Sequence, residues 1–184
     1  MFTQPLEEAI ASTRSILGNV TAEQLDDATP CASWKVRDVI NHMIGSHQYF
    51  IGALTGLPPA IGDAASGDFL AAFDEATSAC VDALQADGVA DRTITLPFGE
   101  VPAPAVAGIA ATDTLTHGWD LARATGQPTD LAPGLAADLL AAAEQNIQDA
   151  FRGPDGKAPF GARQAAPAEA TNADRLAAFL GRPV

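Results

Sequence analysis

Apolar residues recur at helical spacing along most of this chain. The first such segment follows Pro5, a residue that the first turn of a helix tolerates, and Gly18-Asn19 supplies its stop signal. Its inward positions are Leu6, Ile10, Thr13 and Leu17. Thr21 and Gln24 then form a capping-box pattern, which predicts a short second piece.

Two further segments predict long helices. In one, Ser33 is the expected N-cap ahead of Trp34, and an apolar stripe of roughly six turns precedes Gly56. The other runs from about Asp68 and has Gly88 as its C-terminal signal. The inward positions of the two helices are Val36, Val39, Ile40, Met43, His47, Phe50, Ile51 and Leu54, then Phe69, Phe73, Cys80, Val81 and Leu84.

The pattern changes between residues 91 and 106, where alternation followed by Pro-Phe-Gly predicts a short extended excursion or hairpin. A fourth long helix is expected from about Ala105 to Thr125, closed by Gly126. A fifth should run from Pro133 to near Phe151. A short terminal helix should have Asn172 as its cap and Gly181 as its stop.

Ala, Leu, Glu, Gln and Arg favour helix over most of the length, so the fold class is mostly all-α. Four long helices most simply form a four-helix bundle, with the hairpin before the fourth helix and short extra C-terminal helices. A chain of 184 residues is long enough for one core, and we expect a single domain over 1–184.

The formal charge of −13 argues against nucleic acid and anionic membranes as partners, because their negative charge would repel this chain. There is no apolar run of about 18 residues and no signal-peptide pattern at the N-terminus. We therefore expect a soluble, cytoplasmic protein. Acidic bundles with apolar outer helices often pair, which favours a homodimer.

The two cysteines, Cys31 and Cys80, are too few for a disulfide framework. Cys80 falls on the apolar face of a predicted helix and is expected in the core. Cys31 lies in a Thr-Pro-Cys loop, where a role as thiol ligand or nucleophile stays open beside simple burial.

The candidate chemistry lies in the fourth helix. Asp113 and His117 are four residues apart and Asp120 follows three residues later, so three polar side chains share one stripe of an apolar helix. A carboxylate on such a face is costly unless a cation or a hydrogen-bond donor compensates it. Asp113 and His117 therefore form either part of a metal site or an intrahelical hydrogen-bonded pair.

A third ligand would come from one of the other histidines. His47 lies at the centre of its apolar stripe, as a core histidine or a support for the site would, whereas His42 lies on the shoulder beside Ser46. Periodicity does not choose between them. Two histidines and a carboxylate suit a divalent metal, zinc first, with nickel, iron or manganese as alternatives.

Trp34 with His42, followed by Asp113, His117, Asp120 and Leu121, resembles the metal-binding domain of mycothiol-dependent maleylpyruvate isomerase and the wider DinB/YfiT-like superfamily. Thr-Pro-Cys-Ala-Ser-Trp, His-Gly-Trp-Asp-Leu-Ala-Arg-Ala-Thr-Gly-Gln and Asp-Arg-Leu-Ala-Ala-Phe-Leu-Gly-Arg resemble a small actinobacterial metal-binding subfamily. The resemblance implies a DinB-like four-helix bundle with a divalent metal at one end.

The resemblance also implies a ligand set of His42, Asp113 and His117. The position of Asp113 is usually Glu in the isomerase, which changes the reach of the carboxylate. Asp120, His47, Cys31 and Arg123 are the further candidates, as supports behind the ligands or as groups that act on a substrate. By themselves, Arg123 is typical of a solvated arginine, and Trp34 and Trp119 are typical of core packing.

The function implied is a metal-dependent enzyme acting with a low-molecular-weight thiol such as mycothiol, by S-transferase or isomerase-like chemistry. The isomerase has an additional C-terminal domain and this chain stops at Val184, so we do not expect maleylpyruvate isomerisation itself. The alternatives are a non-catalytic metal-binding or small-ligand-sensing protein, and a structural module in which the histidines are merely satisfied.

Overall fold

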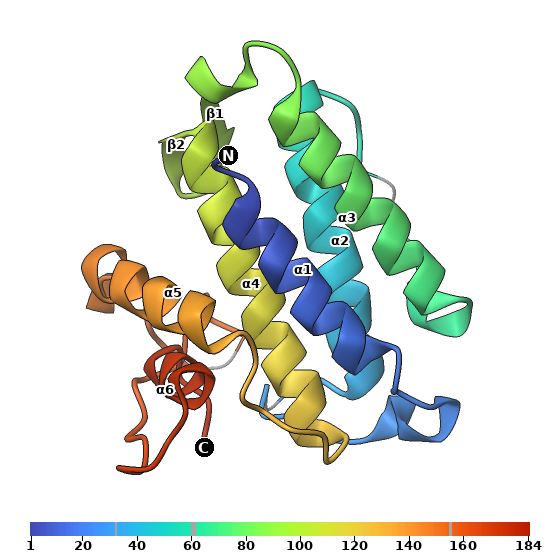
Figure 1. The fold of residues 1–184 in the computed structure, drawn as a ribbon, viewed down its shortest axis with the longest axis vertical. Coiled ribbons are helices and arrows are strands. Elements are labelled where there is room, and N and C mark those ends of the chain that lie inside the picture. Colours follow the sequence, from blue (N-terminus) through green and yellow to red (C-terminus); the bar gives the residue numbers. More distant parts are fainter. Residues whose placement is uncertain (32, 60–61, 155) are drawn as a thin grey trace.

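The computed structural model describes residues 1–31, 33–59, 62–154 and 156–184, and four long helices dominate it (Figure 1). They are α1 (Gln4–Leu17), α2 (Val36–Thr55), α3 (Phe69–Gln85) and α4 (Ala103–Ala124). Their apolar faces meet in one core, in which Leu6, Ile40, Phe73 and Leu115 are fully or almost fully buried. The predicted mostly α-helical bundle is confirmed.

Contacts between the helices define their directions. Thr13 Oγ1 donates to the Thr114 carbonyl at 3.0 Å and the Gln127 amide donates to the Ile16 carbonyl at 3.1 Å, so α1 and α4 run in parallel. Asn41, near the start of α2, binds both Asp63 and the backbone of Ala65. The long connection therefore returns to the start of α2, and α3 runs parallel to α2 and antiparallel to the other pair (Figure 1).

The predicted extended excursion is a hairpin of β1 (Thr93–Leu96) and β2 (Gly99–Pro102). The strands are antiparallel, with Thr93 opposite Pro102 and Leu96 opposite Gly99. Ile94 and Leu96 are buried against the bundle, and Ala103 N–H donates to the Arg92 carbonyl at 2.9 Å. The hairpin thereby fixes where α4 begins.

The remaining helices lie beside the C-terminal half of α4 (Figure 1). α5 spans Pro133–Asn146 and α6 spans Asn172–Phe179, and Trp119 Nε1 donates to Asp174 at 2.8 Å to dock α6 on α4. Four short 3-10 helices complete the described chain: η1 (Ala22–Asp26), η2 (Ala64–Ser66), η3 (Val89–Asp91) and η4 (Asp149–Phe151). The predicted fifth helix is too long, because Ile147 turns extended after Asn146.

Two predicted caps are wrong. α2 begins at Val36 rather than beside Ser33, because Lys35 pairs with Ala28 in an extended bridge and Asp38 accepts the Lys35 N–H at 2.9 Å. α6 is capped by Thr171, which accepts from Asp174 N–H at 3.1 Å, while the Asn172 side chain donates to the Pro133 carbonyl.

A search of the described residues for a membrane-crossing helix finds none with the required length and apolar character.

Candidate metal centre

Two helices bring three metal-binding side chains together. His42 comes from α2, and Asp113 and His117 come from one stripe of α4. Asp113 Oδ1 lies 3.1 Å from His42 Nε2 and 3.6 Å from His117 Nε2, and one ligand atom from each residue falls within 4.8 Å of the others. The structure therefore groups the three residues that the resemblance implied as ligands.

The two nitrogens of His117 face different carboxylates. Nδ1 lies 2.9 Å from Asp120 Oδ2, a hydrogen-bonding distance, whereas Nε2 is 3.6 Å from Asp113 Oδ1, which is too long for a hydrogen bond. Since an ionised carboxylate only accepts, a neutral His117 ring donates from Nδ1 and turns the lone pair of Nε2 toward Asp113. Two acceptors then face each other across a gap that suits a cation.

This donor set fits a divalent metal. Two imidazole nitrogens and one carboxylate oxygen are ligands for zinc and similar ions, and a carboxylate behind a ligating histidine is the usual support for one. Such a set leaves coordination positions open for a substrate. Asp113 is shorter than glutamate, and here it is the hydrogen bonds from α2 that hold it in place.

The Asp113 carboxylate is anchored on both oxygens. Ser46 Oγ, one turn after His42, donates to Oδ2 at 2.8 Å, while Oδ1 faces His42. Burial alone would raise the pKa of Asp113, but the contacts with His42, His117 and Ser46 bring it below its ordinary value. Asp113 therefore stays an anion, as a metal ligand must be.

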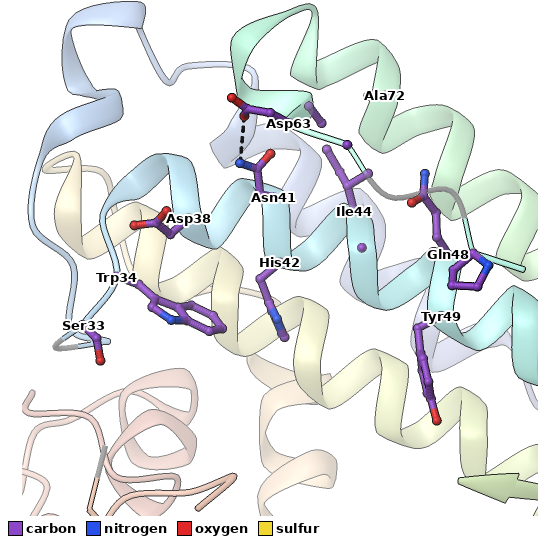
Figure 2. Close-up of a pocket in the computed structure, with 14 residues that line it drawn as sticks. Ser33, Trp34, Asp38, Asn41, His42, Ile44, Gln48, Tyr49, Asp63 and Ala72 are labelled. Carbon is purple, nitrogen blue, oxygen red and sulfur yellow. Dashed lines mark hydrogen bonds between the residues drawn. The ribbon is translucent and has the colours of Figure 1, made fainter. Parts of the chain in front are cut away.

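An indole covers the imidazoles. The half-buried Trp34 ring lies 4.6 Å from the His42 ring and 5.5 Å from the His117 ring, centroid to centroid. The two imidazoles themselves are edge to face at 4.6 Å. Trp34 is therefore a wall of the site rather than only core packing, and Figure 2 shows it beside His42.

A second polar group lies behind His117. Asp120 is fully buried, and its carboxylate accepts hydrogen bonds from Arg182 as well as from His117. Arg182 Nη2 is 3.1 Å from Oδ2, and Arg182 Nε is 3.3 Å from Oδ1. Cys31 Sγ lies 3.4 Å from Asp120 Oδ2 and 3.3 Å from Arg182 Nη2. Burial would raise the pKa of Asp120, but Arg182 and His117 hold it below its ordinary value.

Cys31, His117 and Asp120 also have ligand atoms within 4.8 Å of one another. This second group shares His117 with the first but approaches it from the Nδ1 side. The carboxylate of Asp120 is already bridged by a guanidinium, so the His42, Asp113 and His117 group suits a metal better.

His47 belongs to the core. It is 1 % exposed, its Nε2 is 3.1 Å from Thr114 Oγ1, and its Nδ1 has no partner among the described residues. Burial lowers the pKa of His47 to about 4, against the opposing charge of Asp113, so the ring is neutral. The Cys80 thiol also lies in the core, where burial raises its pKa to about 12 and leaves it inert.

A groove of about 870 Å³ opens beside the candidate ligands, along α2 (Figure 2). Trp34 and His42 belong to its lining, and Asn41, hydrogen-bonded to Asp63 at 2.9 Å, lies further along. The described lining residues include no lysine or arginine. They are Ser33, Trp34, Asp38, Asn41, His42, Ile44, Gly45, Gln48, Tyr49, Pro59, Gly62, Asp63, Ala64 and Ala72.

Sequence reasoning assigned no role to two residues of this cluster. A role for Ser46 could have been predicted, since it lies four residues after His42 on the same helical stripe. Arg182 is the last residue of the C-terminal motif quoted above, but its contact with Asp120 could not be predicted, because 62 residues separate the two. Arg123, the arginine that the resemblance suggested, is exposed on α4 with its guanidinium 5.9 Å from the Trp119 ring centroid.

Comparison with known proteins identifies a family that the chain resembles. The family described as the mycothiol maleylpyruvate isomerase N-terminal domain matches residues 6–122, a range that includes His42, Asp113 and His117. Two uncharacterized proteins of Mycobacterium tuberculosis, from strains CDC 1551 / Oshkosh and H37Rv, are each 43 % identical over 185 residues, covering 100 % of this chain and 97 % of their own. No solved structure matches the chain significantly.

Proposed function

The chain belongs to the mycothiol maleylpyruvate isomerase N-terminal domain family, and from that premise we propose that it is a metal-dependent enzyme acting with a low-molecular-weight thiol. His42, Asp113 and His117 would hold the ion, zinc first and nickel, iron or manganese as alternatives. The observation that carries the proposal is the convergence of the three side chains, with Asp120 behind His117. A bound ion would supply Lewis acidity, which polarises a carbonyl and lowers the pKa of a thiol or a water molecule.

The residues around the ligands have separate tasks in this proposal. Asp120 holds His117 in one tautomer, and Ser46 anchors one oxygen of the Asp113 carboxylate. Trp34 keeps water from one side of the imidazoles. These contacts exist before a substrate binds, so the side chains of the site need little reorganisation during the reaction.

The groove along α2 would bind the body of the thiol. Asn41, Gln48 and Tyr49 offer hydrogen-bonding groups there, while Asp38 and Asp63 make the groove acidic. A neutral, hydroxyl-bearing thiol suits this lining better than a dianionic substrate such as a dicarboxylate. The thiol sulfur would then lie at the end of the groove that Trp34 and His42 form.

Metal content and turnover test the proposal together. Tag-free protein, prepared without chelator and loaded with Zn²⁺, should contain one ion per chain by mass spectrometry, whereas His117→Ala should lose it. Asp63→Asn, which alters a groove carboxylate that is not among the ligands, is the matched control and should keep the ion. The loaded protein should consume mycothiol in the presence of carbonyl or alkyl electrophiles.

No ion in the loaded protein would sink the proposal. An ion without turnover of any thiol over a broad panel of electrophiles would instead support a non-catalytic, ligand-binding protein.

We also propose that the protein acts in the cytoplasm as a homodimer. Light scattering at physiological salt checks the mass of the particle against the 18.9 kDa of one chain.

A further inference from the structure

The Asp120 carboxylate has more partners than a support for one histidine requires. Its Oδ2 is within 3.1 Å of both His117 Nδ1 and Arg182 Nη2, and its Oδ1 is 3.3 Å from Arg182 Nε. Because Arg182 reaches both oxygens, the guanidinium fixes the plane of the carboxylate as well as its position. The orientation of that plane decides where the His117 ring can donate.

We propose that Arg182 is a positioning residue for the metal centre, acting on His117 through Asp120. The inference deepens the proposed function, because it rests on His117 as a ligand of that site. Arg182 need not touch metal or substrate to do this. It keeps the buried carboxylate aimed at Nδ1, so that Nε2 faces Asp113 and His42.

The backbone of Arg182 is itself fixed. Gly181 has a φ of +99°, its N–H donates to the Ala178 carbonyl, and the Arg182 N–H donates to the Ala177 carbonyl. These two bonds form a Schellman motif, which ends α6 and aims the next residue back along the bundle. A side chain at Gly181 would also lie 2.7 Å from the Gly161 Cα, so only glycine fits.

The segment that carries Arg182 is tied down elsewhere as well. Arg152 Nη1 donates to the Phe179 carbonyl at 2.7 Å and to the Gly161 carbonyl at 3.1 Å. The Arg182 side chain is only 11 % exposed, and its Nη1 donates to the Leu180 carbonyl. An arginine held at this many points has little freedom left, as a positioning role requires.

Arg182 lies outside residues 6–122, the range that the family pattern covers. It therefore supports the site from beyond that range, at the end of the motif Asp-Arg-Leu-Ala-Ala-Phe-Leu-Gly-Arg. Lysine would keep the charge at this position but would lose the fork that contacts both oxygens of Asp120. The two properties can thus be separated by substitution.

The test uses the full-length chain with Arg182→Gln and Arg182→Lys. Arg175→Gln is the matched control, because Arg175 lies on α6, the helix that precedes Arg182, and its exposed side chain donates only to the Ala168 carbonyl among the bonds described. The first readout is the His117 tautomer of the metal-free protein, measured by long-range ¹H–¹⁵N NMR. The second is Zn²⁺ affinity, measured by competition with a chromophoric chelator.

We expect wild-type protein and Arg175→Gln to show a single Nδ1–H tautomer of His117. Arg182→Gln should show a mixture of tautomers and a Zn²⁺ affinity lower by about 10- to 100-fold, the usual cost of losing a group behind a ligand. Arg182→Lys should fall between the two. If Arg182→Gln does not fold, Arg182→Lys alone decides.

A folded Arg182 variant with the wild-type tautomer and a Zn²⁺ affinity within twofold of wild type would overturn the inference. The tautomer readout needs no metal. If wild-type protein bound no Zn²⁺, the proposed function would fail, and the tautomers of the variants would still show whether Arg182 orients His117.

Discussion

At the scale of single residues, the same chemical group has different roles in different surroundings. His42 and His117 turn a nitrogen toward a carboxylate, whereas His47 lies in the core against Thr114 and Phe73. Its burial leaves one ring nitrogen without a partner among the residues described. His47 is therefore a neutral structural residue that acid should disturb.

The pH dependence of stability should reveal this histidine. The pKa of His47 is about 4 in the folded protein, against an ordinary value of 6.5 in the unfolded chain. Between these two pH values the unfolded chain therefore binds more protons than the native protein. Stability should therefore fall on acidification, by about 2 kcal/mol between pH 7 and pH 5 from this residue alone. Urea unfolding in chelator at both pH values measures the change.

His47→Gln is the matched variant, since its amide can still reach Thr114 but does not titrate. Between pH 7 and pH 5 the variant should lose about 2 kcal/mol less stability than wild type, which is the contribution expected from His47. An identical pH dependence in the two proteins would show that His47 is not held neutral by burial.

At the scale of elements, the site depends on how closely α1 and α4 approach. Thr13 of α1 packs on Gly118, next to His117, and a Cβ at Gly118 would collide with the Thr13 side chain. Thr13 also donates to the Thr114 carbonyl, so its side chain cannot move away from Gly118 without breaking this hydrogen bond. Gly118 therefore allows α1 and α4 to pack closely, and this close packing also fixes the position of the neighbouring His117.

Gly118→Ala should therefore destabilise the protein by about 1–3 kcal/mol, as overpacking of a dense core does. Gly108→Ala on the same helix is the control, because nothing lies within 4 Å of its added Cβ. Alanine there should stabilise α4, by up to about 1 kcal/mol. Chemical denaturation of both variants gives the two values, and equal effects would contradict the close approach.

The elements also mark what the sequence could predict. Spacing located the four long helices, the hairpin, and Asp113 with His117 on one stripe, because these depend on neighbours within a few residues. The cap at Ser33 failed because a bridge between Ala28 and Lys35 holds that stretch extended. The contact of Arg182 with Asp120 was not predicted, because only the packing of α6 brings the two residues together.

At the scale of the whole molecule, a metal at His42, Asp113 and His117 would join α2 to α4 across the bundle. Binding to the native state alone adds about 2.7 kcal/mol at a free ion concentration 100 times the dissociation constant. Zn²⁺ should therefore raise the melting temperature of wild type and of Asp63→Asn. His42→Ala should lose the increase, and an unchanged increase in that variant would remove His42 from the ligand set.

X-ray absorption on the Zn²⁺-loaded protein identifies the atoms that bind the ion. We expect a first shell of nitrogen and oxygen alone, near 2.0–2.1 Å, with scattering from two imidazole rings. Sulfur near 2.3 Å would instead place the ion between Cys31, His117 and Asp120, the other group that shares His117. That result would contradict the site described above.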